Sequence, residues 1–382
     1  WTKNFYQDRK MYVMDIDGSN LRCITESLDQ TPSPGVWGKN SSGVYFNVRE
    51  FGQSNVYHAD IKGKVKKITN GNHMLTMNDL VGSDAVATWT DPSNPSDIIS
   101  FSIDKPNKIN RLTDVNKDIF YNVEFGEVEE ITYKSVDEKY VQGWIVKPPN
   151  FDSNKKYPLV LRIHGGPHSM YHVGFNYNFQ LHAAQDQVVL YTNPRGSTGY
   201  GYDFANAIQN AYPGNDYDDI MYGVDEVISR GYIDENRMYV YGGSGGGVLT
   251  SWIVGKTDRF AAASVNYPVT NWFSFVGTTD GATWYYNFKN YPWEDPSEHI
   301  KRSPLMYVAN VKTPTMLMCG EEDLRTPISQ TEEYYQALKM NKVPTVMIRF
   351  TDEYHGTSSK PSNFLRTHGY INAWFDKHSV RK

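Results

Sequence analysis

A serine at the centre of a glycine-rich pentapeptide is the residue whose surroundings point most directly to chemistry. Gly242-Gly-Ser-Gly-Gly246 follows the apolar run 238–241 and precedes the apolar segment 248–254. This order predicts a buried strand, a sharp turn and a helix, with the Ser244 hydroxyl at the turn. Glycines are needed there because side chains would clash or forbid the backbone angles. We predict that Ser244 is a nucleophile; the alternative is a glycine-rich connection with an incidental serine.

A serine hydroxyl becomes a good nucleophile only when a base removes its proton, and that base needs a carboxylate to orient it. Two downstream loops supply these groups. Asp323 follows the predicted strand 316–320, and His355 follows a strand that ends at residue 350. Two carboxylates rival the aspartate from sequence alone: Glu321 and Glu322. The other histidines downstream fall on the final predicted helix: His368 and His378. The order serine, aspartate, histidine is that of α/β-hydrolase sheets.

The reaction also requires N–H donors for the oxyanion of its tetrahedral intermediate. Gly245, directly after the serine, supplies one from its backbone. The segment His164-Gly-Gly-Pro167, at the end of an early predicted strand, supplies the second from Gly165 or Gly166. The sequence does not distinguish between these two glycines.

Competing interpretations of the glycine-rich and histidine-rich segments fail on spacing. The dinucleotide-binding fingerprint Gly-x-Gly-x-x-Gly lacks its glycine at the third place from Gly242 and at the sixth place from Gly243. His164 and His168 suggest a metal pair, but no third ligand is in view. We therefore predict neither a metal nor an organic cofactor.

The elements that must position these residues form an alternating series from Leu159 onward. Continuous apolar strands that alternate with helices favour a parallel sheet covered on both faces. Ligands bind such sheets at the carboxyl ends of the strands, where Ser244 falls. The predicted strands cover residues 159–163, 188–192, 238–241, 262–265, 315–319 and 345–350. The predicted helices cover residues 176–185, 202–211, 216–230, 248–255, 329–340 and 362–377.

The first part of the chain contains a repeat with a different pattern. Its units end in Ile24-Thr25, Ile68-Thr69 and Leu112-Thr113, at intervals of 44 residues, and each alternates apolar and polar residues around a turn. Strand hairpins with a period in the low forties are typical of β-propeller blades. The first unit lacks about 19 residues, so about two and a half blades remain, whereas closed propellers have about 4 to 8.

We therefore expect two domains. A partial β-propeller covers residues 1–127, an α/β-hydrolase domain covers residues 128–382, and the natural N-terminus is missing. Residues 114 to about 150 form a transition that contains a further hairpin over residues 128–146.

Composition excludes several other classes of protein. The formal net charge of -5 gives no case for nucleic acid, and no apolar run is long enough to cross a membrane. Cys23 and Cys319 form no disulfide framework or metal motif. We expect a soluble protein, cytoplasmic or exported, and the sequence leaves a homo-oligomer open.

Several motifs resemble the prolyl oligopeptidase family in its acylaminoacyl-peptidase branch. Beside the serine pentapeptide, they are Asn193-Pro-Arg-Gly-Ser-Thr-Gly-Tyr-Gly201, Thr257-Asp-Arg-Phe260, Ser303-Pro-Leu305 and Asp323-Leu-Arg-Thr-Pro327. The resemblance covers residues 128–378 closely, and the repeats resemble that family's propeller. It implies a serine peptidase for short or N-acylated peptides, with a propeller that screens out large substrates.

The chain departs from many members of that family in two places. Many carry Tyr or Asn where this chain has Gly245, so the backbone donor remains but a side-chain contact is lost. Many have an arginine in the strand after the turn, where residues 265–268 read Val-Asn-Tyr-Pro. We predict that Phe275 and Trp284, among the aromatic residues that follow, line an apolar substrate pocket; ordinary packing is the alternative.

Two other functions remain as rivals. The same three side chains could serve a carboxylesterase that acts on small acyl esters. A non-catalytic protein, in which the propeller strands hold a partner, is the rival of another class, and the complete set of serine, aspartate and histidine disfavours it.

Overall fold

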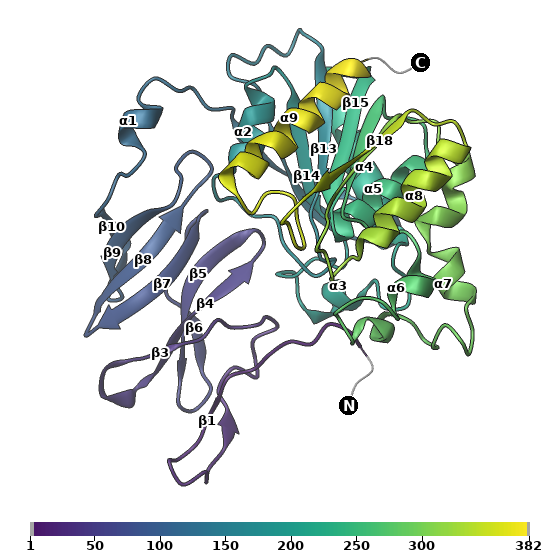
Figure 1. The fold of residues 1–382 in the computed structure, drawn as a ribbon. Helices are drawn as coiled ribbons and strands as arrows, with labels where there is room; N and C mark the ends of the chain where they lie inside the picture. Colours follow the sequence, from purple (N-terminus) through teal and green to yellow (C-terminus); the bar gives the residue numbers. More distant parts are fainter. Residues whose placement is uncertain (1–3, 380–382) are drawn as a thin grey trace.

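The computed structural model describes residues 4–379 and consists of an all-β part followed by an α/β part (Figure 1). The all-β part contains β1 (Tyr12–Val13), β2 (Arg22–Cys23), β3 (Val36–Trp37), η1 (Lys39–Ser41), β4 (Gly43–Glu50), β5 (Gln53–Asp60), β6 (Val65–Lys67), β7 (Met74–Val81), β8 (Asp84–Thr90), β9 (Asp97–Ser102) and β10 (Lys105–Arg111). The short helix α1 (Lys117–Phe120) lies between the two parts of the chain.

The strands of the all-β part pair in successive antiparallel groups. Strands β3, β4, β5 and β6 pair in that order, as do β7, β8, β9 and β10, and one bridge between Ser54 and Met74 joins the groups. Strands β1 and β2 pair only with each other. Apolar side chains of β5, β7, β8 and β9 form one core, and those of β4 and β5 form another with Ile24.

The repeated threonine closes each hairpin of this part in the same way. The Oγ1 atoms of Thr25, Thr69 and Thr113 accept hydrogen bonds from the backbone N–H groups of Met11, Val56 and Ile98 at 2.8, 2.8 and 2.9 Å. The residue before each threonine donates its own N–H back to the same strand residue. The 44-residue period therefore reflects the same pair of hydrogen bonds, which recurs at each of the three threonines.

The α/β part is built on one sheet of eight strands, in the order β11-β12-β14-β13-β15-β16-β17-β18. The strands are β11 (Val128–Lys134), β12 (Tyr140–Val146), β13 (Tyr157–Ile163), β14 (Val188–Asn193), β15 (Ile233–Gly243), β16 (Ala262–Asn266), β17 (Thr315–Gly320) and β18 (Thr345–Phe350). The helices are α2 (Tyr177–Ala183), α3 (Tyr202–Asn206), α4 (Asn215–Ser229), α5 (Gly245–Lys256), α6 (Trp272–Phe275), α7 (Ser297–Lys301), α8 (Ile328–Met340) and α9 (Pro361–Lys377), with 3-10 helices η2 (Val136–Glu138), η3 (Trp284–Asn287) and η4 (Pro304–Asn310).

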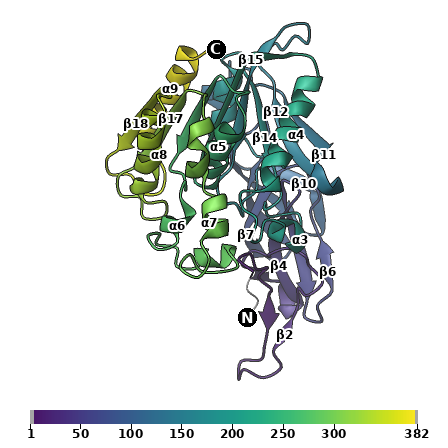
Figure 2. The same ribbon diagram turned by 90° about the vertical axis from the view of Figure 1, so that its right-hand side faces the viewer.

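Helices cover both faces of this sheet (Figure 1, Figure 2). One face packs against α4, α5 and α8 through the largest apolar core. The alternate residues of the same strands, such as Val160 and Tyr239, point to the other face and pack against α9. Helix α2 covers the β12 and β14 end of that second face. None of the helices between residues 4 and 379 combines the length and the apolar character needed to cross a membrane.

The structure corrects the predicted elements in two places. The hairpin over residues 128–146 is no separate transition, because β12 pairs antiparallel with β14 and extends the parallel sheet. Helix α3 ends at Asn206 instead of residue 211, and Ala207 to Ala211 form turns before Tyr212 and Pro213. The division into domains at residue 128 stays a prediction.

A two-residue turn of the all-β part packs against the α/β part. Phe51 and Gly52, between β4 and β5, both have positive φ angles, which is the geometry of a tight hairpin turn. Phe51 N–H donates to Gly199 O at 3.0 Å, and Gly52 O accepts from Val173 N–H at 2.9 Å. A Cβ on Gly52 would lie 2.4 Å from the Trp144 ring, so only glycine allows this close approach.

We predict that Thr69→Val lowers the free energy of unfolding by about 1–3 kcal/mol, because it leaves Val56 N–H without its acceptor and removes one of the two donors to Asn55 Oδ1. Thr69→Ser keeps the hydroxyl and serves as the control. Urea unfolding followed by circular dichroism measures the difference. Equal midpoints for the valine and serine variants would show that the hydroxyl does not support the hairpin.

Candidate active site

Ser244 lies on the sharp turn between β15 and α5. Its φ angle of 57° is in the left-handed region, which residues other than glycine rarely adopt. The backbone around it is too crowded for side chains: a Cβ on Gly242 would lie 2.5 Å from Gly246 O, and one on Gly246 would lie 2.3 Å from Ile163 O. The turn is held by Ser244 N–H, which donates to Asn266 O at 3.1 Å.

The structure brings the serine, histidine and aspartate selected from the sequence into one hydrogen-bonded chain. His355 Nε2 lies 2.9 Å from Ser244 Oγ, and His355 Nδ1 lies 2.9 Å from Asp323 Oδ2. The aspartate follows β17 and the histidine follows β18, so both loops leave the carboxyl ends of parallel strands. The carboxylate orients the imidazole with Nδ1–H directed to itself, which leaves Nε2 free to accept the serine proton.

Burial separates Asp323 from the two rival carboxylates. Asp323 is only 3% exposed, whereas Glu321 and Glu322 are exposed to solvent. Glu321 forms an ion pair with Arg349 at 2.9 Å on the outer surface. Neither rival has a hydrogen bond to His355 among the described residues, so Asp323 is the one of these three carboxylates that contacts the histidine.

Thr326 is a residue of this site that the sequence analysis did not single out. Its N–H donates to Asp323 Oδ1 at 2.8 Å, and its Oγ1 lies 3.0 Å from Asp323 Oδ2 and 2.9 Å from Tyr267 O. The Asp-Leu-Arg-Thr-Pro motif thus supplies both the carboxylate and the group that fixes it. The spacing of three residues, typical of a side chain that caps a nearby N–H, could have indicated this contact.

Tyr267 occupies the strand end where the sequence departs from many relatives. Its ring lies edge-on to His355, with ring centroids 5.2 Å apart. A Cβ on Gly243 would lie 2.2 Å from the same ring. Tyr267 therefore packs between the turn and the histidine and limits how far either can move.

The glycine-rich loop after β13 packs directly on the turn that carries Ser244. A Cβ on Gly165 would lie 3.3 Å from Ser244 Cβ and 3.9 Å from Ser244 Oγ. A Cβ on Gly245 would lie 2.8 Å from Gly166 C, and Gly166 has a φ angle of 117°. Gly245 begins α5, where N–H groups have no acceptor within the helix. The two backbones thus meet beside the serine hydroxyl.

His164 anchors this loop by hydrogen bonds. Its Nδ1 lies 2.7 Å from Gly165 O, and its Nε2 lies 3.0 Å from Ser197 Oγ. Burial lowers the pKa of His164 to about 4, so the ring is neutral near pH 7. The single proton then belongs on Nδ1, facing the carbonyl. Ser197 Oγ lies 3.0 Å from Nε2 and 2.6 Å from Pro194 O, and both can accept its one proton. His168 makes its own contact, with Nδ1 2.9 Å from Gly196 O. No group of three or more potential metal-ligating side chains was found among residues 4–379.

The Asn193–Gly201 motif is held by a buried ion pair. Arg195 Nε lies 2.9 Å from Asp219 Oδ2, and Arg195 Nη2 lies 2.9 Å from Asp219 Oδ1. Asp219, on α4, also accepts from Ser135 Oγ at 2.6 Å. Separating a buried ion pair would leave each charge buried without a partner, which costs free energy. The pair therefore holds the loop that carries Ser197 against α4.

The loop that carries His355 is tied to the rest of the fold by Glu353. This carboxylate is 1% exposed and accepts hydrogen bonds from Ser359 N–H, Ser359 Oγ and Asn363 Nδ2. Its backbone O accepts from Glu322 N–H at 3.1 Å, which links it to the loop of the aspartate. Burial works against ionisation, but the hydrogen bonds from Ser359 and Asn363 outweigh it and hold the pKa of Glu353 below its usual value.

The two predicted pocket residues lie in different environments. Phe275 has no exposed surface and belongs to the core with Trp272, so it cannot contact a substrate in this structure. Trp284 is half-buried and stacks on Phe5 of the all-β part, with ring centroids 5.1 Å apart. Phe5 also stacks on His168 at 5.5 Å. A substrate contact for Trp284 stays a prediction.

Comparison with known families and relatives agrees with the geometry. Residues 173–381 match the model of the prolyl oligopeptidase family. Over 97% of its length the chain is 36% identical to YuxL, an uncharacterized peptidase of Bacillus subtilis (strain 168), and it spans 59% of that protein.

Solved structures give the same result. The chain superposes on the acylaminoacyl peptidase of Pyrococcus horikoshii with a TM-score of 0.88 and 27% identity, covering 100% of this chain and 60% of that one. It is equally similar, at 28% identity and a TM-score of 0.88, to an acylaminoacyl peptidase in complex with Z-Gly-Gly-Phe-chloromethyl ketone, covering 98% of this chain and 59% of that one. The predicted fold class, an α/β-hydrolase sheet preceded by propeller blades, is confirmed.

We predict that Glu353→Gln destabilises the protein by about 2 kcal/mol at neutral pH, because an amide oxygen replaces a charged acceptor of several hydrogen bonds. The folded-state pKa of Glu353 lies below its ordinary value of 4.5, so its carboxylate stabilises the fold fully above about pH 5. That contribution is lost as the pH falls through the folded-state pKa.

Urea unfolding of the wild type and the variant between pH 3 and pH 8 tests this expectation. The stability difference should be constant above about pH 5 and shrink below it. A difference that is independent of pH would contradict the role of the charge. Glu332→Gln, on the exposed face of α8, is the matched control.

Proposed function

The chain belongs to the prolyl oligopeptidase family, and from this membership and the site geometry we propose that it is a serine peptidase that hydrolyses short or N-acylated peptides. The observation that carries the proposal is the 2.9 Å contact between His355 Nε2 and Ser244 Oγ, with Asp323 behind the histidine. The complex of a related acylaminoacyl peptidase with Z-Gly-Gly-Phe-chloromethyl ketone supports a peptide substrate.

In the proposed reaction, Ser244 Oγ attacks the scissile carbonyl carbon while His355 Nε2 takes the hydroxyl proton. Asp323 accepts Nδ1–H and stabilises the imidazolium that forms. The tetrahedral intermediate collapses when the histidine gives its proton to the leaving amine, and an acyl ester on Ser244 remains. Water, deprotonated by the same histidine, then attacks the ester and releases the acid product.

The oxyanion of the intermediate is proposed to accept from Gly245 N–H and from a backbone N–H of Gly165 or Gly166. Close packing of Gly245 on Gly166 supports this arrangement, because it brings donors from two different elements beside the serine. A preorganised donor of this kind contributes about 3–4 kcal/mol to the transition state. The hydrogen bonds of His164 support it further by fixing the loop before the reaction begins.

We also propose that the α/β part and the all-β part have different roles. The described residues from 128 onward carry all the proposed reacting groups, and residues 4–127 cover them as part of a propeller. The contacts of Phe51 and Gly52 with the α/β part support a fixed placement of that cover.

We predict that Ser244→Ala lowers turnover of a peptide anilide by about a million-fold, because the nucleophile is removed. Ser229→Ala, at the exposed end of α4, is the control and should keep full activity. A fluorophosphonate probe should label the wild type and not Ser244→Ala. Near-normal turnover by Ser244→Ala would overturn the assignment. Hydrolysis of nitrophenyl esters without hydrolysis of the anilide would instead favour an esterase.

We predict that Thr326→Val lowers kcat by about tenfold with little change in KM, because Asp323 loses a hydrogen bond that holds it toward His355. Thr326→Ser restores the hydroxyl and should restore kcat. Steady-state kinetics on one peptide substrate separates the two constants. A fall in stability with unchanged kcat would show that the threonine supports the fold and not the orientation of the carboxylate.

A further inference from the structure

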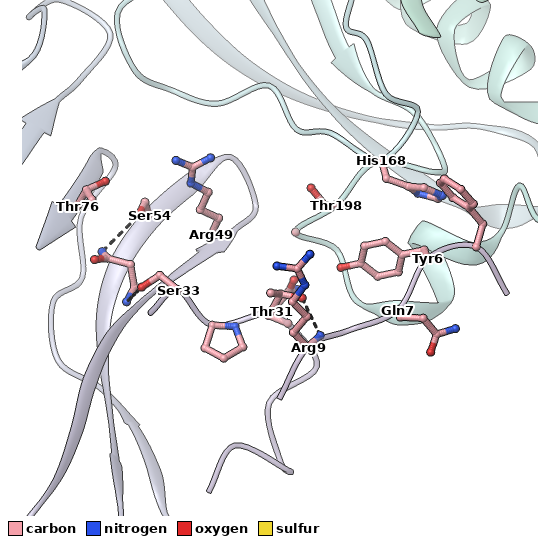
Figure 3. Close-up of a pocket in the computed structure, with 15 residues that line it drawn as sticks. Tyr6, Gln7, Arg9, Thr31, Ser33, Arg49, Ser54, Thr76, His168 and Thr198 are labelled. Carbon is pink, nitrogen blue, oxygen red and sulfur yellow. Dashed lines mark hydrogen bonds between the residues drawn. The ribbon is translucent and has the colours of Figure 1, made fainter. Parts of the chain in front are cut away.

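A cavity of about 640 Å³ lies between the all-β part and the loops that surround the proposed active site. Strands β4, β5 and β7 and the segments around Arg9 and Thr31 form one side of it. His168, Thr198 and Gly199 form the other side. Figure 3 shows Arg9 and Arg49 on the side of the all-β part, and Thr198 and His168 on the opposite side of the cavity.

The lining of this cavity carries two positively charged side chains. It includes Arg9 and Arg49 but no aspartate or glutamate, and its remaining polar groups are mostly uncharged amides and hydroxyls. Neither arginine forms an ion pair with any residue in the part of the chain that the structure describes. Both side chains are exposed to the cavity solvent and available to a ligand.

The acidic residues closest in sequence to this lining have other partners. Asp8 accepts from Tyr6 OH at 2.8 Å, and Asp29 accepts from Tyr202 N–H at 3.0 Å. Glu50 forms an ion pair with Lys67 at 2.9 Å. None of these three acids forms an ion pair with Arg9 or Arg49 among the described residues. Burial, Asp8 and Asp29 together raise the pKa of Tyr6 in the lining, so two carboxylates lie at the edge of the cavity.

The cavity lies within reach of a peptide bound at Ser244. His168 lines the cavity and follows Gly165 by three residues, and a Cβ on Gly165 would lie 3.9 Å from Ser244 Oγ. Three extended residues span at most about 11 Å. A substrate that runs from the serine along this loop thus reaches the cavity within about five residues of its scissile bond.

We propose that Arg9 and Arg49 bind the C-terminal carboxylate of the peptide substrate. The inference rests on the proposed peptidase function and deepens it, because a C-terminal carboxylate always belongs to the leaving-group side of the scissile bond. The planar guanidinium can hold a carboxylate with two parallel N–H···O bonds, which suits it better than lysine for this task. Binding of the carboxylate then selects peptides by the number of residues between the scissile bond and the C-terminus.

Recognition by the two arginines gives the all-β part a role in selectivity. Both arginines precede residue 128, whereas the groups proposed to react all follow it. A peptide with a free carboxylate at the right distance touches both parts at once. An acidic side chain presents the same carboxylate chemistry, so the experiment separates a terminal from a side-chain carboxylate.

Binding of matched peptides to Ser244→Ala tests the proposal without hydrolysis. Three N-acetylated peptides of equal length are compared by calorimetry: one with a free C-terminus, one with a C-terminal carboxamide, and one carboxamide with aspartate as its last residue. The free acid should bind about tenfold more tightly than the neutral carboxamide. The combination with Arg9→Gln or Arg49→Gln should remove that preference, and Arg22→Gln, on the exposed hairpin of β1 and β2, should keep it.

Equal binding of acid and carboxamide, or no binding of the acid up to the millimolar range, would overturn the carboxylate site. Tighter binding of the aspartate carboxamide than of the free acid would overturn the assignment to the C-terminus. Hydrolysis by the wild-type chain is measured separately on the same peptides. If none is cleaved while the free acid still binds preferentially to Ser244→Ala, the proposed peptidase function fails and the carboxylate site stands.

Discussion

The close approach of three backbones at Ser244 is the constraint on which the rest of the site depends. The turn after β15, the first turn of α5 and the loop after β13 meet at distances that leave no space for a Cβ at Gly242, Gly245 or Gly246. Such contact is possible only where strands of one parallel sheet end side by side, as β13 and β15 do. The left-handed angle of Ser244 is kept because every neighbouring segment is packed against it. The glycines therefore allow the proposed oxyanion donors and the proposed nucleophile to lie close together.

The same principle locks the loops that bring the histidine and the aspartate to the serine. A Cβ on Gly320 would lie 2.3 Å from the carbonyl oxygens of both Glu353 and Tyr354, so the end of β17 lies directly against the loop of His355. Glu353 then fixes that loop to α9 through buried hydrogen bonds to its carboxylate. A buried carboxylate in such a network rigidifies the loop only when all its partners are in place. The position of the His355 imidazole therefore depends on Gly320 and Glu353, which lie behind its loop.

Sequence patterns predicted what depends on periodicity and chain order, and missed what depends on side chains that meet across the fold. Continuous apolar strands located β13 to β18, and the order of Ser244, Asp323 and His355 located the reacting groups, because strand ends in a parallel sheet converge at one edge. The pairing of β12 with β14 leaves no local signal in the chain, and neither does the burial of Phe275 in the core. Thr326 lay in a quoted motif, yet its contact with Asp323 became visible only from the geometry.

Net charge does not show where the charged side chains of this chain lie. The chain has 43 acidic and 38 basic side chains, which suggests no attraction for anions. Several acidic side chains form ion pairs with basic neighbours, as Asp219 does with Arg195 and Glu50 with Lys67. Arg9 and Arg49 face a cavity without such partners, and a field confined between two walls is screened less than the same charges on an open surface. Because that cavity exists only where the all-β part docks through Phe51 and Gly52, the turn that joins the two parts also determines which charges a substrate meets.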